Sequence, residues 1–202
     1  MAALGLGCGL GVIAALAEPG PTWGEAFQLP SAWLLVAVVT GAVAQSRRSA
    51  MLWGTVAVLI AVACYYGTLL ETGIRAYADT AQRAAAVWAI VGLACAPPIA
   101  FVGWALTHWR PGIQRGLAAS VLAGWLWCEA ALIWLLWAPG SWLAASAIVE
   151  ASFATVLLAY AAGRTGPFVV SLAASLTVAL AASSLGLAIW RGVDCAAGKF
   201  CS

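Results

Sequence analysis

The chain has 202 residues, of which 64% are hydrophobic and only 8% are charged. A soluble domain carries about 25% charged residues, so this composition excludes a soluble protein, and it excludes a disordered chain as well. The net charge is only +2 and the nine basic residues are scattered, so nucleic acid is not an expected partner. The composition therefore predicts an integral membrane protein whose surroundings are a lipid bilayer.

Seven apolar stretches approach the length of about 20 residues that a helix needs to cross the hydrocarbon layer. In chain order they cover residues 2–17, 29–44, 51–70, 84–106, 117–137, 142–161 and 168–190. Most prolines lie in the connections between stretches or at their starts, where a helix tolerates them. Pro97 and Pro98 lie inside the stretch 84–106 and predict a kink there. We therefore expect one all-α domain over residues 1–202, a polytopic transmembrane helical bundle of about seven spans.

The charges of the connections predict an orientation. The connections that follow the second, fourth and sixth stretches carry five arginines and no acid: Arg47, Arg48, Arg110, Arg115 and Arg164. The connections that follow the first and third stretches carry Glu18, Glu25, Glu71 and Asp79 beside only two arginines. Because cytoplasmic loops are enriched in basic residues, the N-terminus is expected in the cytoplasm and the C-terminus outside. The expected location is the cell membrane, with several passes.

Two carboxylates, Glu129 and Glu150, lie inside apolar stretches rather than in connections. Each is about ten residues from the middle of the turn at 138–141, so both lie about 16 Å below that turn. Two neighbouring antiparallel helices would thus carry carboxyl groups at one depth, although the sequence does not fix the direction in which each points. Two nearby anions are unfavourable in a medium of low dielectric constant, so at least one carboxyl is expected to be protonated.

Aromatic residues gather near these two glutamates. Six of the twelve tryptophans lie near the ends of stretches and are expected to be interfacial anchors: Trp33, Trp53, Trp109, Trp137, Trp142 and Trp190. The aromatic residues expected to line a cavity and bind substrate are Tyr65, Tyr66, Trp88, Trp104, Trp125, Trp127, Trp134 and Phe153. Aromatic faces stabilise cations, and a protonated carboxyl can protonate an alkene, so this combination suits carbocation chemistry.

Other chemistries lack their sequence motifs. The chain has no aspartate-rich DDxxD run, no HExxH and no GxSxG, so no metal or other cofactor is expected. Three alternatives to a catalytic pair remain open for Glu129 and Glu150. They could hold helices together through hydrogen bonds, they could form a proton or ion pathway in a transporter or exporter component, or the chain could be a structural subunit.

The order of several short motifs resembles a known family. These are WLLVA at 33–37, VACYYGTLLE at 62–71, APPIAFVGWA at 96–105, WR at 109–110 and WLWCEAAL at 125–132. Together they are similar to small actinobacterial membrane proteins, including the bacterial membrane-embedded terpene cyclases that make indole sesquiterpenoids of the drimentine type.

The resemblance implies a class II-type terpene cyclase that acts without loss of diphosphate. Its substrate would be a lipophilic prenylated small molecule, such as a farnesyl chain on an indole diketopiperazine. Similar fungal membrane cyclases use two intramembrane acids, which implies catalytic roles for Glu129 and Glu150, with Glu71 as a third candidate.

Overall fold

The computed structural model describes residues 2–18, 30–73, 78–136, 142–163 and 165–196, and the regular structure of these residues is entirely α-helical. Seven helices follow one another: α1 (Ala2–Ala17), α2 (Pro30–Ala42), α3 (Arg47–Thr72), α4 (Ala78–His108), α5 (Ile113–Leu136), α6 (Trp142–Ala162) and α7 (Thr165–Ala196). The prediction of seven apolar helices is confirmed, and most ends agree within a few residues. The main differences are α4 and α7, each of which begins or ends about six residues beyond its apolar stretch.

Within the described ranges, four helices are long and apolar enough to cross a membrane. They are α3, α4 over Ala81–His108, α5 over Ile113–Trp134, and α6 over Ala144–Ala162. These four indicate a multi-pass membrane protein. Shorter apolar segments cover Ala3–Ala17, Ser31–Ala42 and Gly166–Ala182.

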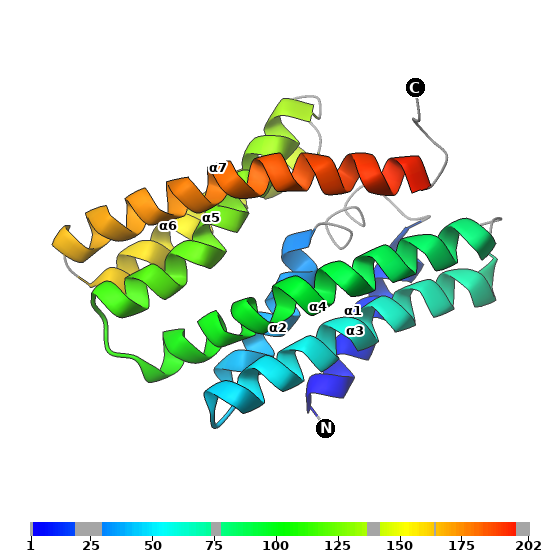
Figure 1. Cartoon of the computed structure of the whole chain (residues 1–202), viewed down its shortest axis with the longest axis horizontal. Helices are drawn as coiled ribbons and strands as arrows, with labels where there is room; N and C mark the ends of the chain where they lie inside the picture. Colours follow the sequence, from blue (N-terminus) through cyan, green and yellow to red (C-terminus); the bar gives the residue numbers. More distant parts are fainter. Residues whose placement is uncertain (1, 19–29, 74–77, 137–141, 164, 197–202) are drawn as a thin grey trace.

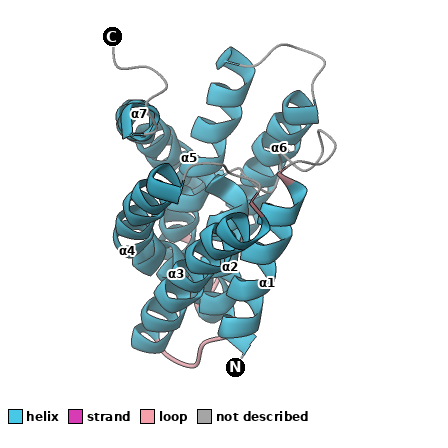
Figure 2. Ribbon diagram, turned by 90° about the vertical axis from the view of Figure 1, so that its right-hand side faces the viewer, coloured by secondary structure: helices cyan, strands magenta, loops and turns pink. Residues whose placement is uncertain are grey.

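The helices form two groups that lie side by side. Figures 1 and 2 show α1, α2, α3 and α4 packed together, with α5, α6 and α7 forming the second group beside them. Helices α2 and α4 both contact α5, so they connect the groups. Where α2 and α4 contact α5, residues far apart in the sequence are neighbours.

Helix α2 is short, and this shortness places its first turn inside the bundle. Its 13 residues span about 20 Å, less than the roughly 30 Å of hydrocarbon. Two glycines let it approach α4 closely, because a Cβ on Gly41 would collide with the backbone of Ala100, and one on Gly103 would collide with the backbone of Val38. Such small residues at a helix contact are typical of membrane bundles.

Helices α5 and α6 form an antiparallel pair whose register is fixed by one hydrogen bond. The indole Nε1 of Trp127 on α5 donates to the carbonyl of Ala151 on α6 at 3.2 Å. Trp127 lies two residues before Glu129, and Ala151 follows Glu150 directly. The bond therefore holds the two glutamates at the same level of the pair.

Candidate functional site

The two intramembrane glutamates meet at the first turn of α2. The backbone N–H of Ser31 donates to Oε1 of Glu129 at 3.2 Å, and the Ser31 hydroxyl donates to Oε1 of Glu150 at 2.8 Å. Ser31, Glu129 and Glu150 are here called the Ser31 site. The equal depth predicted from the spacing around the turn is confirmed, and the structure adds that both carboxyl groups point toward α2.

Glu129 is enclosed and both of its oxygens accept hydrogen bonds. Only 7% of its surface is exposed. Oε1 accepts from the backbone of Ser31, and Oε2 accepts from the indole Nε1 of Trp125 at 3.1 Å. Trp125 precedes Glu129 by four residues and so lies on the same face of α5.

Glu150 is similarly buried, with 9% of its surface exposed, but its two oxygens differ. Oε1 accepts the hydroxyl of Ser31, whereas Oε2 is buried without a hydrogen-bond partner among the residues that the structure describes. A buried polar oxygen without a partner costs free energy, about 1–3 kcal/mol in mutational data. Glu150 Oε2 is therefore the one carboxyl oxygen of the Ser31 site with no hydrogen bond from the described part of the protein.

The start of α2 gives the Ser31 site its electrostatic character. The first N–H groups of a helix have no acceptor within the helix, and together they carry a partial positive charge. Pro30 fits the first position because it has no N–H to satisfy, and the next N–H, that of Ser31, is satisfied by Glu129. Glu129 thus accepts the first N–H of α2, and the helix dipole stabilises negative charge on the carboxyl groups at this end.

Tyr65 and Tyr66, which the sequence predicts to bind substrate, lie in an aromatic group near the first turn of α2. Tyr65 and Tyr66 are buried, with ring centroids 4.9 Å apart, and Trp88 packs against their cluster. The ring of Trp33, two residues after Ser31, meets the Tyr65 ring edge to face at 5.4 Å. The Tyr65 hydroxyl donates to Oε2 of Glu18 at 2.7 Å. The first turns of α2 therefore connect the carboxyl pair with the tyrosine pair.

Other predicted site residues lie elsewhere. Trp134 and Phe153 leave 55% and 51% of their surfaces exposed, so the bundle does not enclose them with the glutamates. Glu71 is exposed near the end of α3. Trp127 packs among α4, α5 and α6 and uses its N–H to fix the register of α5 and α6.

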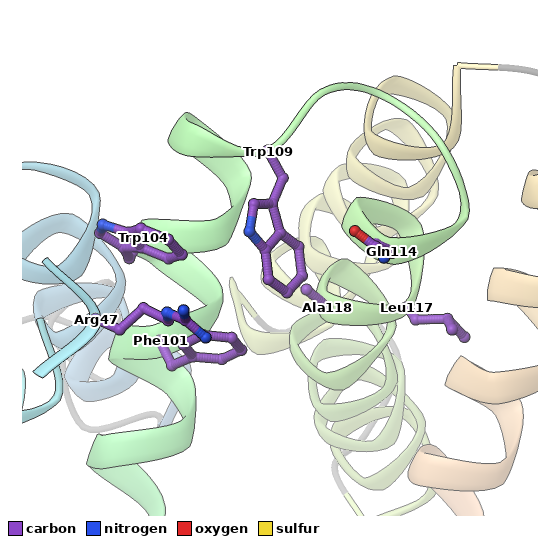
Figure 3. A pocket seen from close by; sticks show the side chains of 7 residues that line it. All are labelled: Arg47, Phe101, Trp104, Trp109, Gln114, Leu117 and Ala118. Atoms are coloured by element: carbon purple, nitrogen blue, oxygen red, sulfur yellow. The ribbon is translucent and has the colours of Figure 1, made fainter.

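Trp104 lies near the C-terminal end of α4, in an open pocket of about 450 Å³ (Figure 3). Along α5, about 20 Å separates this pocket from Glu129 at a rise of 1.5 Å per residue. Trp104 is therefore not a neighbour of the carboxyl pair, because between three and four turns of helix separate the two levels.

Two residues of this region are not evident as site residues from the sequence. The pattern does not distinguish Ser31 from other serines, and it predicts an interfacial anchor at Trp33, whose ring packs on Tyr65 in the structure. The available signal was Pro30 followed by Ser31 at the start of a short stretch, a pattern typical of a helix N-terminus. It could indicate where α2 begins, but not that this beginning lies against α5 and α6.

Comparisons with known proteins add no relatives to this description: no protein-family model, no curated protein and no solved structure matches the chain. In the described ranges, no group of three or more histidine, cysteine, aspartate and glutamate side chains is arranged to hold a metal ion.

Proposed function

We propose that the protein is a membrane-bound terpene cyclase that starts cyclisation by protonating an alkene. The observation that carries the proposal is the unpartnered Oε2 of Glu150, a buried carboxyl oxygen beside the hydroxyl of Ser31. If Glu150 is protonated on Oε2, this O–H can be donated to a substrate, while Oε1 accepts the hydroxyl of Ser31. The proposed substrate is a farnesyl chain on an indole diketopiperazine, and its diphosphate has been lost before this reaction.

The proposed reaction conserves the atoms of the substrate. Glu150 gives its proton to the terminal alkene of the farnesyl chain, whose π electrons form the new C–H bond and leave a tertiary carbocation. The next alkene attacks this cation and closes a ring. Loss of a proton from a carbon next to the final cation restores an alkene, and the proton returns to a carboxylate. The product is a cyclic isomer of unchanged mass, and no metal takes part.

Glu129 acts as a positioning residue in this proposal. Both of its oxygens are occupied by N–H donors, one from Ser31 and one from Trp125, so it has no equivalent free oxygen to offer a substrate. It holds the first turn of α2 in place, and α2 in turn presents the Ser31 hydroxyl to Glu150. After proton transfer, that hydroxyl and the dipole of α2 stabilise the Glu150 carboxylate.

Aromatic side chains support the cationic part of the proposal. The indole of Trp125 lies at Glu129, and the rings of Trp33, Tyr65 and Tyr66 form a group that starts two residues from Ser31. Faces of such rings stabilise cations without forming bonds to them. Exclusion of water by the surrounding helices would prevent early capture of the carbocation.

The proposed topology is seven passes through the cell membrane, with the N-terminus in the cytoplasm and the C-terminus outside. It rests on the arginine-rich connections at 47–48, 110–115 and 164. In this arrangement α2 begins at the level of Glu129 and Glu150.

The test is conversion of a farnesylated indole diketopiperazine by membranes that contain the protein, followed by mass spectrometry and NMR of the products. We expect cyclic isomers of unchanged mass, and we expect Glu150→Gln to lower turnover about 100-fold or more because the general acid is lost. The control is Ser120→Ala, a buried α5 residue whose hydroxyl donates to the Leu117 carbonyl within its own helix. Unchanged turnover in a folded Glu150→Gln protein would overturn the proposal.

A second candidate is a proton-coupled transporter component, favoured by the two buried carboxyl groups at the start of α2. Transporters often place the ends of interrupted helices at ion-binding sites near the middle of the membrane, and α2 begins at two carboxyl groups. This alternative predicts flux across proteoliposomes that depends on a pH gradient, lost in Glu150→Gln, with no isomerised product. The two functions are therefore separated by product analysis and flux measurements on the same protein.

A further inference from the structure

A pocket near the C-terminal end of α4 differs in charge from the Ser31 site. It is lined by one arginine and no acid, whereas the Ser31 site contains two carboxyl groups. The pocket is open, has a volume of about 450 Å³ and lies where α3 begins and α4 ends. We call it the Arg47 pocket after the one charged side chain in its lining. Figure 3 shows aromatic side chains of α4 and the segment after it on one side, and side chains of α5 on the other.

The aromatic side of the pocket is a packed cluster. The rings of Phe101 and Trp104 stack with centroids 6.1 Å apart, and the ring of Trp109 meets the Phe101 ring edge to face at 5.5 Å. The His108 ring also stacks on Trp104, with centroids 4.7 Å apart. On the α5 side, Leu117 and Ala118 add apolar surface and Gln114 adds an amide. The pocket thus combines a rigid apolar wall with polar groups at its opening.

Arg47 supplies the one positive charge among the residues that line the pocket. Its guanidinium carbon lies 5.8 Å from the centre of the Trp104 ring, and Figure 3 shows the side chain reaching toward Trp104 and Phe101. None of the residues that line the pocket is acidic. Arg47 also begins α3, whose first N–H groups carry partial positive charge. An anion bound at the guanidinium would therefore meet a positive charge with no acidic residue in the pocket lining.

Apolar walls and a cation at the mouth fit an amphiphile with an anionic head. The ends of apolar helices, with tryptophan and arginine side chains, are the level at which lipid headgroups meet a membrane protein. We propose that the Arg47 pocket binds an anionic phospholipid, with the phosphate at Arg47 and the glycerol and upper acyl chains against Phe101, Trp104 and Trp109. A free phosphate would use the arginine but would leave the aromatic wall without a partner.

The test compares three probes on the purified chain in detergent. Dihexanoyl phosphatidic acid is the expected ligand, dihexanoyl phosphatidylcholine tests the need for net charge, and inorganic phosphate tests the need for the apolar part. We expect phosphatidic acid to raise the melting temperature most and to remain bound in native mass spectrometry. Equal stabilisation by inorganic phosphate would overturn a lipid site, and equal stabilisation by phosphatidylcholine would overturn an anionic one.

A matched pair of variants locates the binding. Arg47→Gln removes the guanidinium at the pocket, whereas Arg48→Gln removes the same charge from the next residue, which does not line the pocket. We expect Arg47→Gln to weaken phosphatidic acid binding at least fivefold and Arg48→Gln to change it less than twofold. Trp104→Leu is expected to weaken it as well, with Arg47 still present. Equal effects of the two arginine substitutions would show attraction by net charge alone and would contradict the proposal.

Discussion

The Ser31 site and the Arg47 pocket use similar residues in opposite ways. In the Ser31 site the indole of Trp125 offers its N–H edge to a carboxyl group, and the carboxyl groups are enclosed between two groups of helices. In the Arg47 pocket the indole of Trp104 offers its face to a guanidinium, and the pocket is open. A tryptophan count therefore says little about chemistry, because the edge and the face of the ring favour charges of opposite sign.

The two regions also differ in how their geometry is maintained. The Ser31 site joins α2, α5 and α6 by hydrogen bonds between residues about 100 positions apart in the sequence. The Arg47 pocket is formed mainly by α4, α5 and the start of α3, which are close to one another at that end of the fold. Substitutions in the first region should therefore affect stability, whereas those in the second should mainly affect binding.

The largest expected effect on stability separates the two glutamates of the Ser31 site. Glu129→Gln places an amide NH₂ opposite one of two N–H donors, so one buried donor loses its acceptor, at a cost of about 2–3 kcal/mol. Glu150→Gln can keep its oxygen toward the Ser31 hydroxyl and should cost clearly less. Thermal unfolding in detergent measures both.

The same two variants show whether the regions are independent. The melting-temperature response to phosphatidic acid should persist in Glu129→Gln, because about 20 Å along α5 separates the two regions. A lost response in a folded variant would contradict the separation, and equal destabilisation by the two substitutions would contradict the assignment of Glu129 as the positioning residue.

The next effect concerns the contact that holds α2 against α4. Gly41→Ala adds a Cβ that would collide with the backbone of Ala100, and we expect a loss of about 1–2 kcal/mol. Gly67→Ala on α3 is the matched control, since a Cβ there meets nothing within 4 Å, and it should be neutral or slightly stabilising. If both variants unfold at the temperature of the wild type, close packing of α2 does not position Ser31.

The smallest effect compares the tryptophans of the two regions directly. Trp125→Phe removes a hydrogen bond to Glu129, whereas Trp104→Phe removes an N–H that is buried without a partner among the described residues. We expect Trp125→Phe to be the more destabilising by about 1 kcal/mol, since the loss of an unsatisfied donor has no hydrogen-bonding cost. Chemical unfolding curves of the two variants can resolve this difference, and the reverse order would contradict the contrast between the two regions.

The fold was largely predictable because its signal is local. Long apolar stretches separated by prolines and charges locate each helix, and the symmetric placement of Glu129 and Glu150 around one turn predicts their common level. The partner of the two carboxyl groups was not predictable, since Ser31 reaches them only through the packing of α2 between distant helices. Trp134 and Phe153 show the same limit, because closeness along a helix does not determine whether a side chain faces the bundle interior.

The position of Ser31 also sets an order for assembly of the protein. A ribosome completes α2 more than 85 residues before Glu129, and still longer before Glu150. Until α5 and α6 have entered the bilayer, the N–H of Ser31 lacks the acceptor that the finished fold gives it, in surroundings where unsatisfied backbone groups are costly. The first four helices are thus synthesised before the elements that carry the acceptors of Ser31, and the Ser31 site can form only after α5 and α6 have been made.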